Sequence, residues 1–144
     1  MHRWRAWLDD LWRAGTGTRL FGDQGERAAA RYLKKQGMRI LARQYRSRMG
    51  EIDLIARDGE TIVFVEVKSR RSHAAGRPEE AVTMTKQRQL TRLALEYLKR
   101  RGWLGTRRAR FDVVSVTWPT DQSRPEIVHF RNAFEPVGVD GMFS

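Results

Sequence analysis

The chain has 144 residues and a formal net charge of +11, from 28 lysines and arginines against 17 aspartates and glutamates. This length predicts one domain, and a composition of 40% hydrophobic and 31% charged residues excludes a disordered chain. The chain contains no cysteine, which excludes disulfides and thiolate metal sites, while the positive charge favours a phosphate-bearing partner, either nucleic acid or an anionic membrane.

Residues 1–21 form a basic, tryptophan-rich extension that begins "MHRWRAWLDDLWRAG". Two interpretations stay open: an arm that contacts nucleic acid or membrane, or a short helix or tail beside the domain. The acidic pair Asp9 and Asp10 interrupts any signal peptide, and no run reaches the ~18 apolar residues of a membrane span. We therefore expect a cytoplasmic protein and do not expect a membrane partner.

The hydrophobic pattern predicts an α/β domain over residues 22–137, followed by a tail at 138–144. A capping box of Asp23 and Glu26 predicts the start of the first helix, and Asp58-Gly59 predicts a hairpin turn. The strand at 61–68 is apolar on both faces, so it should be central and covered on both sides. The predicted order is α-β-β-β-α-β-β, a mixed sheet with flanking helices, at residues 23–36, 38–45, 51–56, 61–68, 78–101, 110–118 and 127–134.

Acidic residues gather at one end of the predicted hairpin. If Asp58-Gly59 is a two-residue turn, Glu51 lies opposite Glu66, and Asp53 is the diagonal neighbour of Glu66. Because strand side chains alternate, these three acids share a face with Lys68. Such a group needs a cation, the lysine or a raised pKa to offset its repulsion.

Carboxylate oxygens with open coordination positions suit Mg²⁺ or Mn²⁺. A metal there could activate a water for attack on a phosphoryl group, with Lys68 assisting the nucleophile. The alternative is a hairpin edge whose acids pair with arginines and carry out no chemistry.

Basic residues surround this cluster in the sequence. They flank the first predicted strand turn, occupy the loop after Lys68 and continue into the second helix, where a nucleic-acid backbone would need them. The alternative is a solvated basic face that aids solubility. The candidates for nucleic-acid binding are Arg46, Arg48, Arg70, Arg71, Arg77 and Lys86.

The sequence also resembles a known family. Asp53 followed thirteen positions later by Glu66-Val67-Lys68 resembles the PD-(D/E)xK nuclease motif. The ordered blocks "GERAAARYL", "GEIDLIARDG", "VFVEVKSRR", "GRPEEAV" and "RFDVV" resemble the YraN family, whose members are similar to archaeal Holliday-junction resolvases. The resemblance implies a restriction-endonuclease-like fold.

The resemblance implies roles for individual residues. Asp53 and Glu66 would bind the metal beside the Val67 carbonyl, and Lys68 would be catalytic. Glu26 matches an acid that resolvase-like members add to the site, although its capping-box role explains it equally well. Glu51 matches the "GEID" block and would be an accessory residue.

These observations lead to one expected function and two alternatives. We expect a nucleic-acid-binding, Mg²⁺- or Mn²⁺-dependent endonuclease that acts on DNA rather than RNA, on branched or structured substrates, with a homodimer as one assembly to test. The first alternative is a non-catalytic nucleic-acid-binding module that acts with a partner. The second is a peripheral membrane or scaffold protein.

Overall fold

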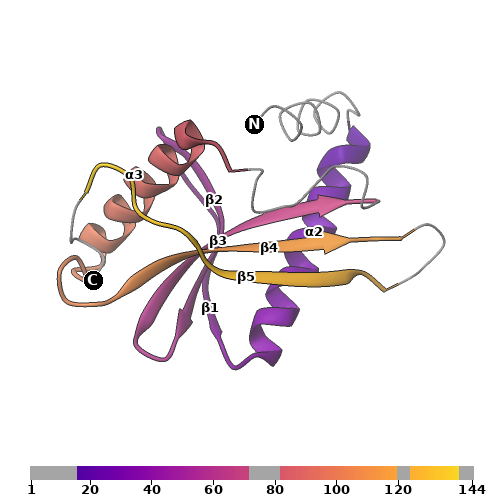
Figure 1. Cartoon of the computed structure of the whole chain (residues 1–144), viewed down its shortest axis with the longest axis horizontal. Helices are drawn as coiled ribbons and strands as arrows, with labels where there is room; N and C mark the ends of the chain where they lie inside the picture. Colours follow the sequence, from indigo (N-terminus) through magenta and orange to yellow (C-terminus); the bar gives the residue numbers. More distant parts are fainter. Residues whose placement is uncertain (1–15, 72–81, 120–123, 140–144) are drawn as a thin grey trace.

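The computed structural model describes residues 16–71, 82–119 and 124–139. Its elements follow the predicted order, α-β-β-β-α-β-β, and confirm a mixed sheet with flanking helices (Figure 1). No helix within the described ranges is long and apolar enough to cross a membrane. The elements are α2 (Thr16–Lys35), β1 (Arg39–Ser47), β2 (Gly50–Asp58), β3 (Thr61–Arg70), α3 (Met84–Arg100), β4 (Ala109–Thr117) and β5 (Glu126–Phe134).

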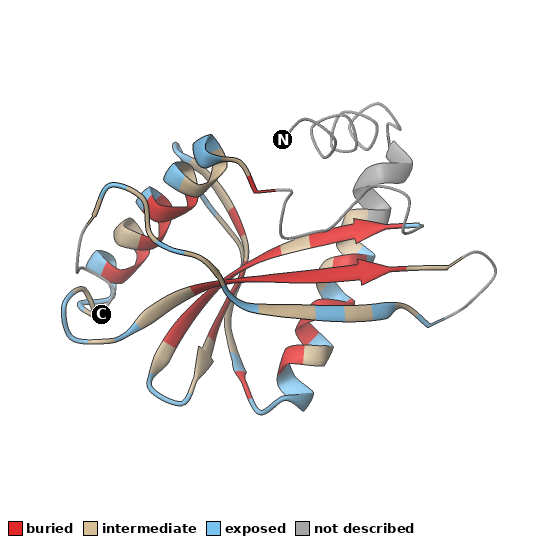
Figure 2. Ribbon diagram, viewed as in Figure 1, coloured by how far each residue is buried: buried red, intermediate tan, exposed pale blue. Residues whose placement is uncertain are grey.

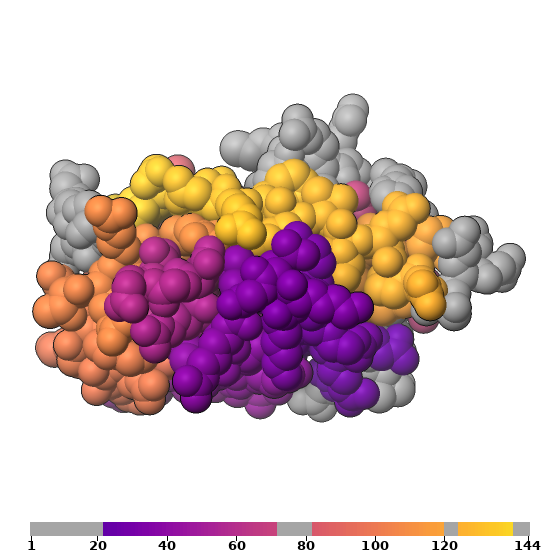
Figure 3. Space-filling model, turned by 90° about the horizontal axis from the view of Figure 1, so that it is seen from below, coloured from indigo at the N-terminus to yellow at the C-terminus, as the bar shows by residue number. Residues whose placement is uncertain are grey.

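The five strands lie in the order β1-β2-β3-β4-β5. Only β3 and β4 are parallel to each other, and α3 makes the crossover between them. The remaining neighbours pair antiparallel. The strand β3 is therefore central, as its apolar run predicts. In Figure 3 the part of α2 that is drawn in indigo and β5, in yellow, both reach the surface.

Two helices cover opposite faces of the sheet, because the strand side chains alternate between two cores. Phe64 packs with Leu93 and other residues of α3 in one core. Val63 and Val65 pack with Leu33 and the alanines of α2 in the other. Figure 2 shows the resulting buried band along β3 and β4. The outer strand β5 has no buried residue; its positions are exposed or partly covered.

The first helix begins at Thr16, so the predicted start at Asp23 is wrong and Asp23 does not cap the helix. Glycines at 17, 22 and 25 favour a loop in an isolated sequence, but the helix continues through them, and its later turns pack on the sheet. Gly25 is required by this packing, because a Cβ there would overlap the Ser69 hydroxyl and lie 2.9 Å from the Ser69 Cβ.

The second helix also differs from its prediction. It begins at Met84 rather than at Pro78, which lies outside the described residues. Thr83 is the N-cap, and its hydroxyl accepts a hydrogen bond of 2.9 Å from the Lys86 N–H. Threonine is a favoured N-cap residue because its side-chain oxygen satisfies a free backbone donor of the first turn.

The β2–β3 hairpin turns one residue later than predicted. Asp58 pairs with Thr61, so Gly59 and Glu60 form the turn. Gly59 has φ +59°, which suits the first central position of a type II′ turn. This moves the register by two residues, so every side chain keeps its predicted face. The predicted pairing of Glu51 with Glu66 is wrong, because the observed register, continued, brings Asp53 opposite Glu66.

Candidate metal centre

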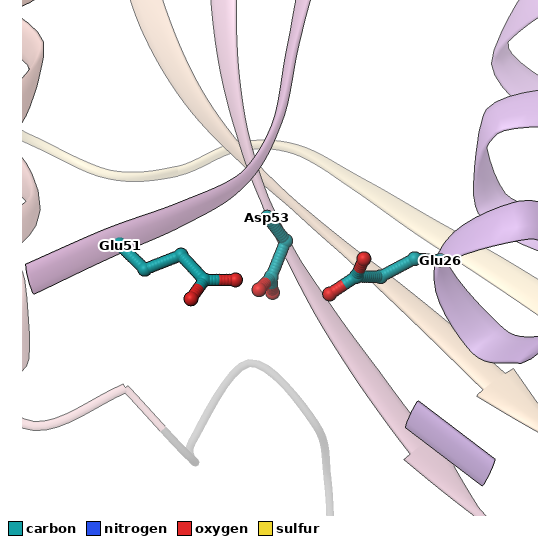
Figure 4. Close-up of side chains that lie close together, drawn as sticks. All are labelled: Glu26, Glu51 and Asp53. Carbon is teal, nitrogen blue, oxygen red and sulfur yellow. The ribbon is translucent and has the colours of Figure 1, made fainter. Parts of the chain in front are cut away.

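The acidic residues meet where β2 separates from β3. The ladder between the two strands ends at the pair Leu54–Val65, beyond which β3 continues beside β4 while β2 turns away (Figure 1). Glu26 reaches this point from α2, and Glu51 and Asp53 reach it from β2. Their side chains point toward one another, and one oxygen of each lies within 4.8 Å of the other two (Figure 4).

Asp53 is the central member of the group. It is half-buried, and its Oδ2 accepts a hydrogen bond of 2.8 Å from the Val67 N–H. Desolvation raises the pKa of Asp53 well above its usual range, the Glu66 carboxylate raises it further, and the Val67 N–H opposes them. A proton or a bound cation would relieve this electrostatic cost.

Glu66 and Lys68 lie on β3, next to Asp53 of β2. Both side chains are buried, with 8% and 5% of their residues' surface exposed. The Lys68 Nζ lies 3.3 Å from Glu66 Oε1. Glu66 Oε2 is buried and has no hydrogen-bond partner within the described part of the chain. A buried carboxylate oxygen without a partner is costly, so this atom is a strong candidate to receive a ligand.

Glu26 is oriented by a residue that the sequence did not indicate. Gln44 of β1 donates from Nε2 to Glu26 Oε2 at 3.0 Å and to Asp23 Oδ1 at 3.3 Å. Burial raises the pKa of Glu26 above its usual value, and the Gln44 hydrogen bond offsets part of that rise. Glu26 lies inside the helix and faces Asp53, so the capping-box interpretation of Glu26 is wrong.

Gln44 adopts the left-handed conformation, with φ 49°, within a β-strand. That conformation is uncommon for a residue with a side chain and costs about 1–3 kcal/mol, so the surrounding contacts must hold it. No sequence signal marks it, because glutamine has no special preference for this region.

Glu51 joins the three-carboxylate group but also pairs with a cation. Its Oε2 lies 2.9 Å from Arg46 Nε in an exposed ion pair on neighbouring strands. Such a pair contributes little stability. Glu51 therefore stands at the outer side of the centre, between Asp53 and the basic β1–β2 turn.

The predicted nucleic-acid-binding residues fall in different environments. Arg70 is buried and donates to Thr117 Oγ1 at 3.3 Å, so its guanidinium is not at the surface where a backbone would pass. Lys86 is half-buried at the start of α3. Arg77 lies outside the described residues. The residues at the surface are Arg46, Arg48 and Arg71.

A second charged group lies on β4 and β5. Asp112 is fully buried and accepts hydrogen bonds from Arg110 Nε at 3.0 Å and from the Asn132 N–H at 2.9 Å. His129 Nε2 lies 2.7 Å from Asp112 Oδ2. Burial alone would raise the pKa of Asp112, but these hydrogen bonds outweigh it and lower the pKa. The group holds an irregular strand pair together and leaves no carboxylate free for a metal.

Comparisons with known proteins agree on the family. The model of the Uncharacterised protein family UPF0102 matches residues 25–116. A UPF0102 protein of Desulfosudis oleivorans is 52% identical over 116 residues, which are 80% of this chain and 89% of the relative. One from Geobacter sulfurreducens is 48% identical over 81% of this chain and 90% of the relative.

A relative from Rhodopirellula baltica is 43% identical and aligns with 98% of this chain and 86% of its own. Among solved structures, Pyrococcus furiosus SfsA in complex with Ca²⁺ aligns with 79% of this chain and 63% of its own, at 18% identity and a TM-score of 0.37. The chain therefore belongs to the UPF0102 family, which confirms the YraN resemblance.

Proposed function

We propose that this protein is a metal-dependent endonuclease that hydrolyses phosphodiester bonds in nucleic acid. The observation that carries the proposal is the buried Glu66 Oε2, which has no hydrogen-bond partner among the described residues and lies on the strand that Asp53 contacts. A divalent cation would give this oxygen the partner that it lacks. The expectations of a DNA substrate, a cytoplasmic location and a homodimer stay predictions.

Asp53 would be the shared ligand of the centre, with Glu66 on one side and Glu26 and Glu51 on the other. In a strand, the N–H and C=O of one residue point to the same side. Since the Val67 N–H points to Asp53, the Val67 carbonyl also points toward β2 and can add a neutral oxygen ligand. Oxygen donors of this kind suit Mg²⁺ or Mn²⁺.

When bound, the cation supplies charge stabilisation at the phosphoryl oxygens and lowers the pKa of a coordinated water. Hydrolysis forms a bond from the water oxygen to phosphorus and breaks one P–O ester bond, with a proton passing to the leaving oxygen. Lys68 Nζ, now 3.3 Å from Glu66 Oε1, is the side chain that would orient the attacking water and stabilise developing charge.

A panel of duplex, single-stranded and branched substrates with Mg²⁺ or Mn²⁺ tests this function. Asp53→Asn and Lys68→Ala should each abolish cleavage while the proteins stay folded. Asp58→Asn, at the other end of β2, is the control and should cleave normally, because the Asp58 carboxylate accepts hydrogen bonds from Arg110 and Arg131 at the hairpin end, away from the metal centre. Cleavage that survives both site substitutions would reject the assignment.

The Lys68–Glu66 contact also supports a second candidate. A lysine that already neutralises the buried acid is what a binding module without turnover would have. Calorimetry separates the two candidates: the nuclease should take up Mn²⁺ in an Asp53-dependent manner. A module should take up none and should leave every substrate intact.

A further inference from the structure

The outward side of α3 carries cations that the metal centre does not use. Arg88 and Arg92 are exposed on successive turns, and within the described residues neither has an ion pair or hydrogen bond from its side chain. An i, i+4 spacing places them about 6 Å apart along the helix. We propose that α3 is the track that holds the phosphate backbone of a double-stranded nucleic acid.

Packing fixes which side of α3 faces outward. Leu90, Leu93 and Tyr97 are buried against the sheet. Arg88 and Arg92 fall on the other side and are exposed, since a helix turns 100° per residue. The acid of this helix, Glu96, interacts with other residues. Its Oε1 accepts a hydrogen bond of 2.6 Å from the Tyr45 hydroxyl and lies 3.9 Å from a guanidinium nitrogen of Arg100.

The track leads to the metal centre. Gln89 Nε2 donates to the Met49 carbonyl at 2.6 Å, which fixes α3 to the β1–β2 turn. That turn carries the exposed Arg48, which likewise has no ion pair in the described residues, and it runs directly into Glu51. A backbone lying along α3 would therefore pass from Arg92 through Arg88 and Arg48 toward Asp53.

The character of the surface favours a duplex. Proteins that hold single strands stack bases on exposed aromatic rings. The exposed residues of α3 include no aromatic residue, since Tyr97 is buried. A duplex presents phosphates and keeps its bases stacked, so cations without rings suffice. Membrane binding is a poorer fit, because an interfacial helix inserts its apolar side, and that side of α3 is in the core.

The other helix offers a matched control. Arg27 and Arg31 of α2 are also exposed, have the same i, i+4 spacing, and lack ion pairs among the described residues. α2 covers the opposite face of the sheet. Arg88→Gln/Arg92→Gln and Arg27→Gln/Arg31→Gln therefore remove the same charge from the two faces, and both keep a good helix former.

This inference rests on the proposed function but is measured by binding alone. The full chain with Asp53→Asn, in EDTA, is titrated into a fluorescent 24-base-pair DNA duplex and its single strand at several salt concentrations. Loss of two phosphate contacts should make the negative slope of log K against log salt shallower by about 1.8. If the lines meet near 1 M, binding at 0.1 M weakens roughly 60-fold.

The outcomes are distinct. The proposal expects the salt slope to change by this amount in Arg88→Gln/Arg92→Gln and to stay at the wild-type value in Arg27→Gln/Arg31→Gln. It also expects the protein to bind the duplex more tightly than the single strand. Equal losses in both variants would overturn it, as would wild-type binding to anionic vesicles but not to duplex. A normal slope in the α3 variant overturns the track and leaves the nuclease proposal standing. If the wild type cleaves no substrate but the α3 variant shows the expected change in salt slope, only the nuclease proposal is rejected.

Discussion

Asp53 should make the metal-free protein less stable, and Asp53→Asn should therefore raise its free energy of unfolding. The substitution removes a charge that lies beside Glu26 and Glu51 and on which Glu66 also acts. An asparagine Oδ1 can still accept the Val67 N–H, so the backbone contact is kept. The expected gain comes from relief of like-charge repulsion and desolvation.

The geometry sets the size of the gain. Two carboxylates 4.8 Å apart, the upper limit within the Glu26, Glu51 and Asp53 group, repel by about 3.5 kcal/mol at an effective dielectric of 20 and about 0.9 kcal/mol in water. Because Asp53 can also escape the repulsion by taking up a proton, we expect a gain of about 1–2 kcal/mol. This corresponds to a Tm higher by about 3–8 °C.

The pH dependence has a definite sign. The pKa of Asp53 is raised by folding, so the folded state binds its proton more tightly than the unfolded state. Below the unfolded pKa of about 3.9 both states are protonated and Asp53→Asn should change little. As pH rises toward the folded pKa the wild type loses stability and the difference grows to a plateau.

Thermal unfolding in EDTA between pH 4 and pH 8 measures this difference. Asp58→Asn is the control of opposite sign, because Asp58 accepts from Arg110 at 2.9 Å and has cations rather than acids beside it. Saturating Mn²⁺ should reverse the order, since about 100-fold excess over Kd adds about 2.7 kcal/mol to the wild type alone. If Asp53→Asn lowers stability in EDTA, or if its gain does not change with pH, the reasoning is refuted.

Three further substitutions test the supports of the fold and the centre. Gln44→Ala should weaken Mn²⁺ binding about 10-fold or more by calorimetry, because Glu26 loses its orienting donor, and an unchanged affinity would show that Gln44 is not needed. Gly25→Ala should cost about 1–3 kcal/mol in urea unfolding through overlap with Ser69. Adding Ser69→Gly should recover part of that cost, and no recovery would place the clash elsewhere. Asp112→Ala should cost about 3 kcal/mol at pH 7. The pKa of Asp112 is lowered by folding, so this contribution is present above the unfolded pKa, and the difference from wild type should shrink as pH falls through the folded pKa.

Strand alternation was sufficient to bring Asp53, Glu66 and Lys68 together from the sequence. The turn prediction was off by one residue at Gly59, yet the register moved by two, and a shift of two leaves every side chain on its face. Strand alternation could not predict which residue of the neighbouring helix joins the site. Glu26 reaches the centre because Gly25 lets α2 approach β3, a tertiary contact that local sequence does not encode.

The left-handed Gln44 is a similar case. Its side chain donates hydrogen bonds to two carboxylates from a helix about 20 positions earlier in the chain, those of Asp23 and Glu26. Residue propensity concerns neighbours in sequence, so a conformation held by distant contacts cannot be predicted from it. The length of α2 was also missed, because the glycines near its start lower helix propensity, whereas the helix as a whole is packed on the sheet through its later turns.

The separation of β2 from β3 links the stability of the sheet to the candidate chemistry. Beyond Leu54–Val65 the Val67 N–H has no β2 carbonyl to bond, and Asp53 Oδ2 takes that place. The acid thus satisfies a backbone donor that the split would otherwise leave without a partner, and an unsatisfied buried donor costs about 1–3 kcal/mol. Asp53→Ala removes the charge and this hydrogen bond together, whereas Asp53→Asn removes the charge alone. The difference in unfolding free energy between the two variants therefore measures what the hydrogen bond from the Val67 N–H contributes to stability. The decrease in Mn²⁺ affinity that the two variants share measures what the Asp53 charge contributes to the metal centre.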